Sequence, residues 1–332
     1  MALFSRRKKT PDSTDTSAGR GPDESDAATP SDAPSPEPPA SVGISTSTFR
    51  GVGASAAGPP VPAPTVPAPP APVAEAETIP GVRDNVLLRD ALAELSDPPT
   101  PQGLLNVARQ LLQGPLFLRV KGNARALLAE GRGLPLAVTR RGDKQLVLAY
   151  SSGAALQAAV SADGEADTSA VGQPVLTVLR LVLDGEYEGL ILDNSSGTAR
   201  ALLPRPLLQR VVDDAHAALA LKSLLAGVRT EDTPAAVAAA LGEAPLWIAV
   251  RRTEEGGPVG IAESRTADGD RFIEVFSHPL EVLALGRGDQ PLPVTLDQLH
   301  AAVTADAGIT GLLIDPGGPW LRLHRDHVTG PA

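Results

Sequence analysis

A short aliphatic phrase that occurs twice constrains this chain more than any other feature. Gly189-Leu-Ile-Leu-Asp-Asn194 returns as Gly311-Leu-Leu-Ile-Asp-Pro316, each time as a glycine, three large aliphatic residues and a turn-forming pair. This composition is typical of a short buried strand that stops where the chain reverses. Two copies in similar surroundings predict that one folded pattern is present twice.

Other patterns recur around the two phrases in the same order. Thr100-Pro101 and Thr233-Pro234 each offer a helix N-cap followed by proline at the first helical position. Pro115-Leu-Phe-Leu-Arg-Val120 is matched by Pro245-Leu-Trp-Ile-Ala-Val250, with an aromatic residue at the same place. Any one match arises easily by chance, whereas the whole series in one order favours a tandem duplication.

Within each unit the elements predict an α+β fold. Two leading helices, a strand, a hairpin, further helices and the repeated strand favour a mainly antiparallel or mixed sheet with helices covering one face. In the first unit the expected strands are 116–120, 134–139 and 145–150, the last two joined by the polar turn 140–144. The predicted domains are 82–209 and 210–328, joined through a helix near 205–225.

The first 80 residues differ from the rest in composition. They hold 16 of the 33 prolines, with serine, threonine, alanine and glycine filling much of the remainder. Such a segment buries too little apolar surface to offset the entropy of ordering it, so we predict a disordered tail. Its basic tip, residues 6–9, follows Leu3 and Phe4 and is interpreted either as a solvated start or as a weak contact with anionic lipid.

Composition excludes several classes of function. The net charge is −10, which argues against general nucleic-acid binding. There is no cysteine, so disulfides and thiolate chemistry are excluded. No apolar run approaches the roughly 18 residues of a membrane-spanning helix. The basic start has no apolar segment after it and is not a secretory signal. We therefore expect a cytoplasmic protein.

No set of residues converges on a catalytic, cofactor or metal site. Ser195 and Ser196 are interpreted as turn residues, because no nucleophile elbow surrounds them. His324-Arg-Asp-His327 has metal-ligating residue types, but a polar surface cluster is the preferred interpretation. We predict no enzyme activity, no cofactor and no metal. The expected interaction sites are two turns, formed by Asp193, Asn194 and Gly197 and by Asp315, Pro316, Gly317 and Gly318.

Paired phrases in both units resemble the N-terminal domain of the SseB family. The phrases are Ala149-Tyr-Ser-Ser152 and Val275-Phe-Ser-His278, followed by the endings Leu192-Asp-Asn-Ser-Ser-Gly197 and Ile314-Asp-Pro-Gly-Gly318. In that family the strand usually ends in Asn-Pro-Gly, so Asp315 departs from the pattern and the first unit lacks the Pro-Gly pair. The resemblance covers about residues 100–328, implies tandem SseB-like domains and a link to secretion or to serine sensitivity, and carries no catalytic assignment.

Three functional hypotheses follow. The first is a non-enzymatic interaction or scaffold protein with an unknown protein partner. The second is a sensor that binds a small ligand between the two units, since such interfaces are common pocket sites. The third is a membrane-proximal adaptor that uses the basic tip at residues 6–9.

Overall fold

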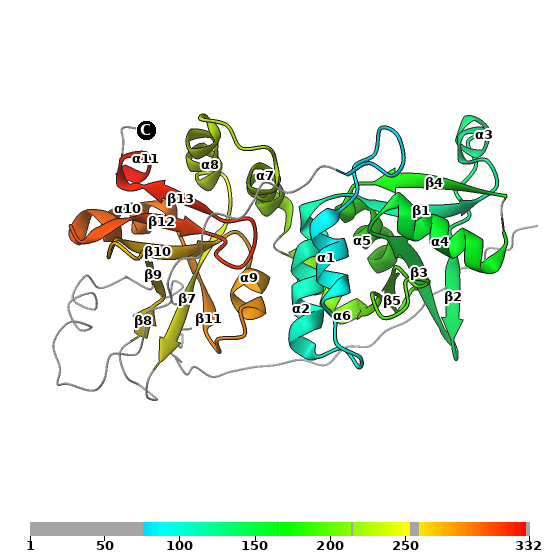
Figure 1. Ribbon diagram of the computed structural model, residues 1–332, viewed down its shortest axis with the longest axis horizontal. Helices are drawn as coiled ribbons and strands as arrows, with labels where there is room; N and C mark the ends of the chain where they lie inside the picture. The colour runs from blue at the N-terminus through cyan, green and yellow to red at the C-terminus, as the bar shows by residue number, and fades with distance from the viewer. Residues whose placement is uncertain (1–75, 166, 214, 253–258, 330–332) are drawn as a thin grey trace, which may run out of the picture. The chain divides into compact units, whose positions relative to one another are not determined.

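The computed structural model describes residues 76–165, 167–213, 215–252 and 259–329 (Figure 1). We call residues 76–213 the first half and residues 215–329 the second half. Each half contains one mixed sheet and several helices, which confirms the predicted α+β class. The predicted tail lies outside the described residues up to position 75, and with it the basic tip.

The first half forms a sheet in the order β4-β1-β3-β5-β6, with β2 paired to β3. β3 and β5 run parallel, and the other neighbours are antiparallel. The strands are β1 (Leu116–Lys121), β2 (Val138–Arg141), β3 (Lys144–Tyr150), β4 (Thr168–Gln173), β5 (Gly189–Leu192) and β6 (Ala201–Pro204).

The second half repeats this order as β11-β7-β10-β12-β13, with β8 beside β7 and β9 beside β10. Again the central pair, β10 and β12, is parallel and its neighbours are antiparallel. The strands are β7 (Leu246–Arg252), β8 (Val259–Ile261), β9 (Glu263–Arg265), β10 (Arg271–Phe276), β11 (Gln290–Val294), β12 (Ile309–Ile314) and β13 (Leu321–His324). The two halves therefore share strand order and direction, whereas their origin from one duplicated sequence stays a prediction.

The helices also correspond in order, except that α3 and η2 have no counterpart in the second half. In the first half they are α1 (Val86–Ala93), α2 (Pro101–Gln110), the 3-10 helix η2 (Leu111–Gln113), α3 (Ala124–Ala129), α4 (Gly153–Asp163), α5 (Val175–Asp184) and α6 (Arg205–Asp213). In the second half they are α7 (Ala215–Ala226), α8 (Thr233–Leu241), α9 (Pro279–Ala284), α10 (Leu296–Ala305) and α11 (Arg325–Thr329).

Local sequence explains where several helices begin. Thr100 caps α2 by accepting a hydrogen bond from the N–H of Gly103, with Pro101 at the first position as predicted. Ser152 caps α4 in the same way, and Thr295 caps α10 together with Gln298 in a reciprocal capping box.

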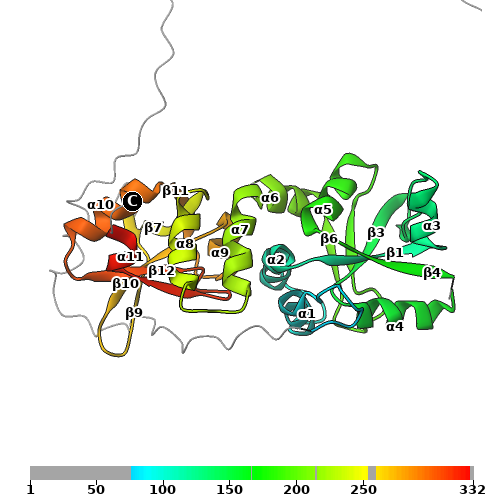
Figure 2. The same ribbon diagram turned by 90° about the horizontal axis from the view of Figure 1, so that it is seen from above.

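Helices cover both faces of each sheet, not one face as predicted. In the first half, alternate residues of β1 and β3 point to opposite sides: Leu118 and Ala149 pack against α1, α2 and α5, whereas Phe117 and Tyr150 pack against α4. In Figure 2, α4 and α5 accordingly lie on opposite sides of the sheet. In the second half α9 has the place of α4, with Val282 against Phe276.

The repeated phrase of the sequence forms the buried strands β5 and β12, and its glycine has a steric reason. A Cβ at Gly189 would overlap the carbonyl oxygen of Leu203 on β6, and a Cβ at Gly311 would overlap that of Leu323 on β13. Only glycine lets the last strand of each sheet approach so closely.

Some elements differ from the prediction. The expected strand 134–139 is β2, which lies further along at Val138–Arg141. The helix expected near 205–225 is two helices, α6 and α7, on either side of position 214, which lies outside the described residues. The strands β4 and β11 and the helix α3 were not predicted. β4 is short, rich in small residues and only partly buried, so it lacks the apolar alternation that marks a strand.

Candidate functional site

In each half, a serine and an aspartate are hydrogen-bonded to each other at the end of the central pair of parallel strands. In the first half, Asp193 follows β5 and accepts two hydrogen bonds from Ser151, which follows β3: one from the N–H (2.8 Å) and one from the hydroxyl (2.6 Å). In the second half, Asp315 accepts the same two bonds from Ser277, at 2.8 and 2.6 Å. Because parallel strands end at the same sheet edge, each aspartate reaches the serine of its neighbouring strand.

Both aspartates have left-handed backbone conformation, with φ of +49° at Asp193 and +47° at Asp315. Among non-glycine residues, aspartate and asparagine adopt this conformation most readily. Both carboxylates are buried and point inward. The two aspartates are therefore not available at the surface. The surface part of each predicted interaction turn consists of residues 194–197 or 316–318, which are partly or fully exposed.

A buried group of charges surrounds the turn of the second half. The Lys222 ammonium on α7 forms ion pairs with Glu281 on α9 and, at 3.6 Å, with Oδ2 of Asp315. Arg109 on α2 donates to Oε2 of Glu281 (2.9 Å) and to the carbonyl oxygen of Gly317 in the predicted turn. We call Arg109, Lys222, Glu281 and Asp315 the buried charge cluster.

Burial and charge act in opposite directions within this cluster. Burial disfavours the ionised form of Glu281, but the attraction of Lys222 and Arg109 outweighs burial and lowers the pKa of Glu281. At Asp315 burial dominates and raises the pKa, although Lys222 partly offsets it. The Glu281 carboxylate is therefore the main counter-charge that keeps both buried cations paired.

His278 lies beside the cluster and caps α9. Its Nδ1 accepts a hydrogen bond from the N–H of Leu280 (3.1 Å), and its Nε2 is buried without a hydrogen-bond partner among the described residues. Burial, and next the charge of Lys222, lower the pKa of His278 to about 4. The imidazole is thus neutral at physiological pH.

The first half keeps the serine–aspartate turn without the buried cations. Leu88-Arg89 and Leu221-Lys222 stand at the same spacing before the matched Thr100 and Thr233, but the Arg89 side chain is 46% exposed whereas Lys222 is fully buried. Burial raises the pKa of Asp193, which the bonds from Ser151 offset only in part.

Sequence reasoning found the turns but missed their partners. Ser151 and Ser277 lie in the phrases that carried the family resemblance, so the parallel pairing of β3 with β5 would have predicted their contact with the aspartates. Arg109, Lys222 and Glu281 lie on helices of ordinary composition, and nothing in the sequence marks them as buried. Of the histidine pair, His324 packs edge-on against Phe272 and His327 lies in α11; in the described residues no group of acidic or histidine side chains is placed to hold a metal ion.

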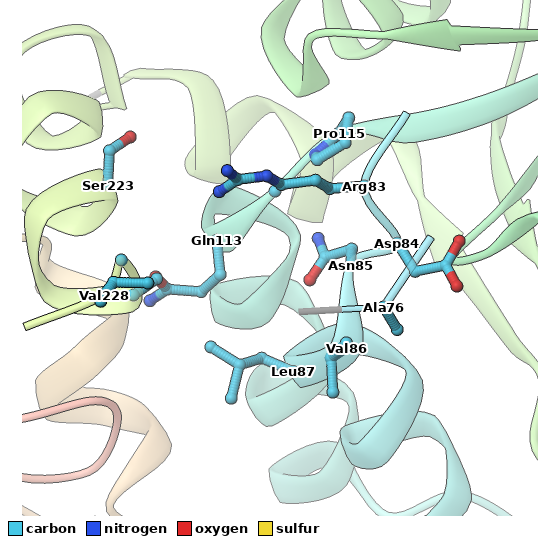
Figure 3. A pocket seen from close by; sticks show the side chains of 13 residues that line it. Ala76, Arg83, Asp84, Asn85, Val86, Leu87, Gln113, Pro115, Ser223 and Val228 are labelled. Atoms are coloured by element: carbon cyan, nitrogen blue, oxygen red, sulfur yellow. The ribbon is translucent and has the colours of Figure 1, made fainter. Parts of the chain in front are cut away.

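A cavity of about 190 Å³ lies between the start of α1, the end of η2 and the last turn of α7 (Figure 3). The side chains of Arg83, Gln113 and Ser223 surround it. Both the amide nitrogen and the amide oxygen of Gln113 are buried without a hydrogen-bond partner among the described residues. This cavity lies between elements of the two halves, the region in which the second hypothesis from the sequence places a small ligand.

The edge strands β4 and β11 differ in their outward residues. Gly122, directly after β1, donates a hydrogen bond to the carbonyl oxygen of Asp167 (2.9 Å). Because hydrogen-bonded and non-hydrogen-bonded pairs alternate along an antiparallel ladder, the N–H and C=O groups of Thr168, Ala170 and Gly172 face the free edge of β4. In the described part of the chain no hydrogen bond reaches these groups.

The equivalent positions of β11 are prolines. Gln173 of β4 pairs with the first residue of β1, and Val294 of β11 pairs with the first residue of β7. By this alignment Ala170 corresponds to Pro291, and Gly172 corresponds to Pro293. Ala249 accepts a hydrogen bond from Ala262 on the other side of β7, which places both prolines on the outward side of β11. Proline has no N–H, so the edge of β11 is blocked and that of β4 is open.

A groove of about 680 Å³ follows β4 and is walled by α3. Its lining includes Arg125 and Leu128 of α3 and the edge residues of β4, and the Leu128 side chain is 58% exposed. β6 and β13, at the opposite ends of the two sheets, are four residues long and contact helices α2 and α6 or α8 and α11.

Comparison with known proteins gives one match. Residues 219–329 match the family model of the SseB protein N-terminal domain. No curated protein and no solved structure matched the chain. Of the helices that the structure describes, none is long and apolar enough to cross a membrane. The match takes in the sheet, the buried Lys222, Glu281 and Asp315 and the second turn, so the resemblance predicted from the sequence is confirmed for the second half as an SseB N-terminal domain.

Proposed function

We propose that this protein is a non-enzymatic interaction protein that binds an extended segment of a partner protein along β4. The observation that carries the proposal is the difference between the two edges: β4 presents outward N–H groups at Ala170 and Gly172 where β11 has Pro291 and Pro293. An extended segment that joins a sheet edge gains backbone hydrogen bonds, and adjacent pockets select its side chains.

The groove beside β4 supports this mode of binding. Its wall offers the exposed side chain of Leu128 for an apolar residue of the partner, and Arg125 for a polar or acidic one. The partner segment must be free of proline at the positions that donate to Thr168, Ala170 and Gly172, because each missing N–H removes a ladder bond.

Lysine and carboxylate side chains can serve in acid–base catalysis, but the geometry of the buried charge cluster supports a structural role for them here. Lys222 and Glu281 are fully buried, and Arg109 of α2 encloses them by bonding Glu281 and the carbonyl of Gly317. Gln102, also on α2, donates to the carbonyl oxygens of Leu283 and Ala284 at the end of α9. In this proposal these contacts fix α2 against the second half and hold the scaffold rigid.

Substitution of Ala170 by proline tests the proposal. The side chain of Ala170 is exposed, and β11 carries proline at the corresponding place, so Ala170→Pro is compatible with this type of sheet. Affinity capture from the native host with the full-length protein should recover a partner with the wild type and with Ala170→Val, which keeps the N–H. The same partner should be lost with Ala170→Pro.

Equal capture by wild type and Ala170→Pro would exclude strand addition at β4. Light scattering of the purified proteins separates a different outcome: a dimer that Ala170→Pro dissociates would make a second copy of this chain the occupant. The membrane hypothesis concerns residues 6–9, outside the described residues, and it stays a prediction, as does the link to secretion that the resemblance implied.

A further inference from the structure

The open edge of β4 lies close to the point where the described chain begins. The outward N–H and C=O groups of Thr168, Ala170 and Gly172 have no hydrogen-bond partner among the described residues. The described chain starts at Ala76, and Ile79 already lines the groove beside β4. Three residues of chain span at most about 11 Å, so the 75 residues before Ala76 are attached next to this edge.

The groove has a different wall on each face of β4. On one face the hydroxyl of Ser169 accepts from the N–H of Ala124 (3.0 Å), which fixes the start of α3 there. Consecutive residues of a strand point to opposite faces, so Gly172 belongs to the other face. There a Cβ on Gly172 would lie only 2.5 Å from the side chain of Val82. A strand added to β4 therefore meets a crowded side near Val82 and, on the α3 side, the exposed side chain of Leu128.

The α3 side of the groove also carries charge. Asp167 lies one residue before β4 and two positions from Ser169, which puts it on the same side as Ser169. It is exposed, lines the groove and forms no ion pair with another described residue. A strand that fits this edge therefore has a basic residue beside Asp167, branched side chains toward α3 and small side chains toward Val82. It also has no proline where an N–H must be donated.

One segment ahead of the described chain has this composition. Residues 40–58 form the longest run without proline in the first 80 residues, and they contain no acidic residue. Within this run, residues branched at Cβ alternate with small ones, a pattern that favours a strand with two different faces. The alternating residues are Ile44, Thr46, Thr48 and Arg50 on one side and Ser45, Ser47 and Phe49 on the other.

We infer that residues 44–50 of this chain add to β4 as an antiparallel strand and compete there with the partner segment. In the register that places Arg50 beside Asp167, Ser47 lies opposite Ala170, and the residue opposite Gly172 is also a serine. The branched side chains then face α3, and the two serines face the crowded side. This occupant rests on the proposed function for the choice of β4 as a strand-accepting edge, and it adds a means of regulating that edge.

The chain between this segment and the fold has a suitable length. Residues 51–75 must span about the length of β4, roughly 20 Å for six residues. As a polyproline II spacer, residues 59–72 measure about 43 Å. The remaining eleven residues of the connection can fold back by up to about 35 Å, so the required span is within reach. A tether that can span its site gives the attached segment a high effective concentration there.

A partner segment can displace the chain's own strand through Arg125. This arginine of α3 lines the groove, and no described residue forms an ion pair with it. Residues 44–50 hold no carboxylate to match it. A partner strand with an acidic residue at this place gains a contact that the chain's own segment lacks, so it can compete in spite of the tether.

Hydrogen–deuterium exchange of the full-length protein, read by mass spectrometry on peptides from β4, tests the inference. Thr46→Pro combined with Ser47→Pro removes two N–H groups from the segment and leaves the described fold untouched. Exchange across Thr168–Gln173 should become about tenfold faster than in the wild type, because the outward N–H groups lose their acceptors. Ser13→Pro combined with Thr14→Pro makes the same exchange of residue types elsewhere, and should behave like the wild type.

A charge reversal tests the register. Arg50→Glu places a carboxylate beside Asp167 and should also make the exchange of β4 faster, by less than the two prolines do, because an exposed ion pair contributes little. Arg20→Glu is the matched control, with the same change of charge outside the segment, and should leave the exchange unchanged.

Equal exchange of β4 in the wild type and in Thr46→Pro/Ser47→Pro would overturn the inference. Protection of β4 that is lost on dilution would overturn it too, because an intramolecular strand does not depend on protein concentration.

Affinity capture separates this inference from the proposed function. Thr46→Pro/Ser47→Pro should capture more partner than the wild type, since the edge is vacated. If β4 exchanges as expected but Ala170→Pro captures the same proteins as the wild type, the added strand stands and the proposed partner site fails. Loss of capture by Ala170→Pro together with equal exchange has the reverse meaning: the partner site stands and the chain's own segment is not its competitor.

Discussion

Ser277 donates two hydrogen bonds to Asp315, one from its backbone N–H and one from its hydroxyl, and so joins the ends of the parallel strands β10 and β12. Ser151 and Asp193 make the same pair of bonds between β3 and β5. Each aspartate also holds a left-handed turn that an ordinary residue would strain. Each copy of the repeated sequence phrase thus ends in an aspartate that accepts the same two hydrogen bonds from a serine.

Removing the serine hydroxyl should affect the two halves unequally. Ser151→Ala leaves Oδ2 of the buried Asp193 without its hydroxyl donor and should lower the free energy of unfolding by about 1–3 kcal/mol. Ser277→Ala should cost less, because Lys222 lies 3.6 Å from Oδ2 of Asp315. Guanidinium unfolding measures both, with the exposed Ser161→Ala as a near-neutral control. Equal losses in the two halves would contradict the compensation by Lys222.

The glycine that begins each repeated phrase should not tolerate a side chain. Gly311→Ala places a methyl group against the carbonyl oxygen of Leu323 and should cost about 2 kcal/mol or more, since the backbone of β13 must move. Gly260→Ala in β8 is the matched control, because its nearest neighbouring atom lies 3.7 Å from the added carbon. Equal stability of the two variants in thermal or guanidinium unfolding would show that β13 yields without strain.

The sequence was sufficient for the elements with strong local signals. Thr100-Pro101 predicted the start of α2, and the aliphatic phrases predicted β5 and β12, because caps and apolar runs are written in adjacent residues. β4 was missed since Thr168–Gln173 consists of small and polar residues, and its place in the sheet depends on pairing with β1. The covering of both sheet faces was also missed, because α4 carries few large apolar residues.

The site depends on contacts that no local pattern encodes. Arg109 and Glu281 are far apart in the chain, and their ion pair exists only because α2 packs against α9. Arg205 and Arg325 are similar: each follows the last strand of its half and donates to backbone carbonyls at the end of α5 or α10. No local sequence pattern marks either arginine as a donor to helix carbonyls, so only the folded structure distinguishes them from surface charges.

Neutralising the central carboxylate of the buried charge cluster should be strongly destabilising. Glu281→Gln keeps the shape of the side chain but removes the main counter-charge of Lys222 and Arg109, and a broken buried ion pair costs about 3–5 kcal/mol. Guanidinium unfolding should show this loss, whereas Glu186→Gln at an exposed site should stay within about 0.5 kcal/mol of the wild type.

A double-mutant cycle separates the ion pair from the packing of α2. If Arg109→Met and Glu281→Gln act on one interaction, the loss in the double variant should differ from the sum of the single losses by about 0.5–3 kcal/mol. Additive losses would mean that Arg109 stabilises the contact through the carbonyl of Gly317 and the packing of its alkyl chain, and not through Glu281.

His278 should make stability depend on pH in the mildly acidic range. Its pKa is about 4 in the folded protein against about 6.5 when unfolded, so between these values the unfolded chain binds more protons. The free energy of unfolding should therefore fall as pH decreases from about 6.5 and level off near pH 4, by about 3 kcal/mol in total. Burial and Lys222 favour the neutral imidazole, whereas the charge of Glu281, the backbone of Val211 and the charge of Asp213 raise the pKa of His278 only in part.

Asparagine at position 278 provides the matched control, because its side-chain oxygen can replace Nδ1 as acceptor for the N–H of Leu280 and cap α9 without titrating. The free energy of unfolding of wild type and of His278→Asn is measured with denaturant at about pH 4, 5, 6 and 7, which spans the window between the two pKa values. The difference between the two proteins should grow in favour of the variant as pH falls. Carboxylates common to both proteins cancel in this difference. A constant difference across the series would show that the imidazole becomes protonated inside the folded protein without penalty, and hence that its Nε2 reaches an acceptor or water.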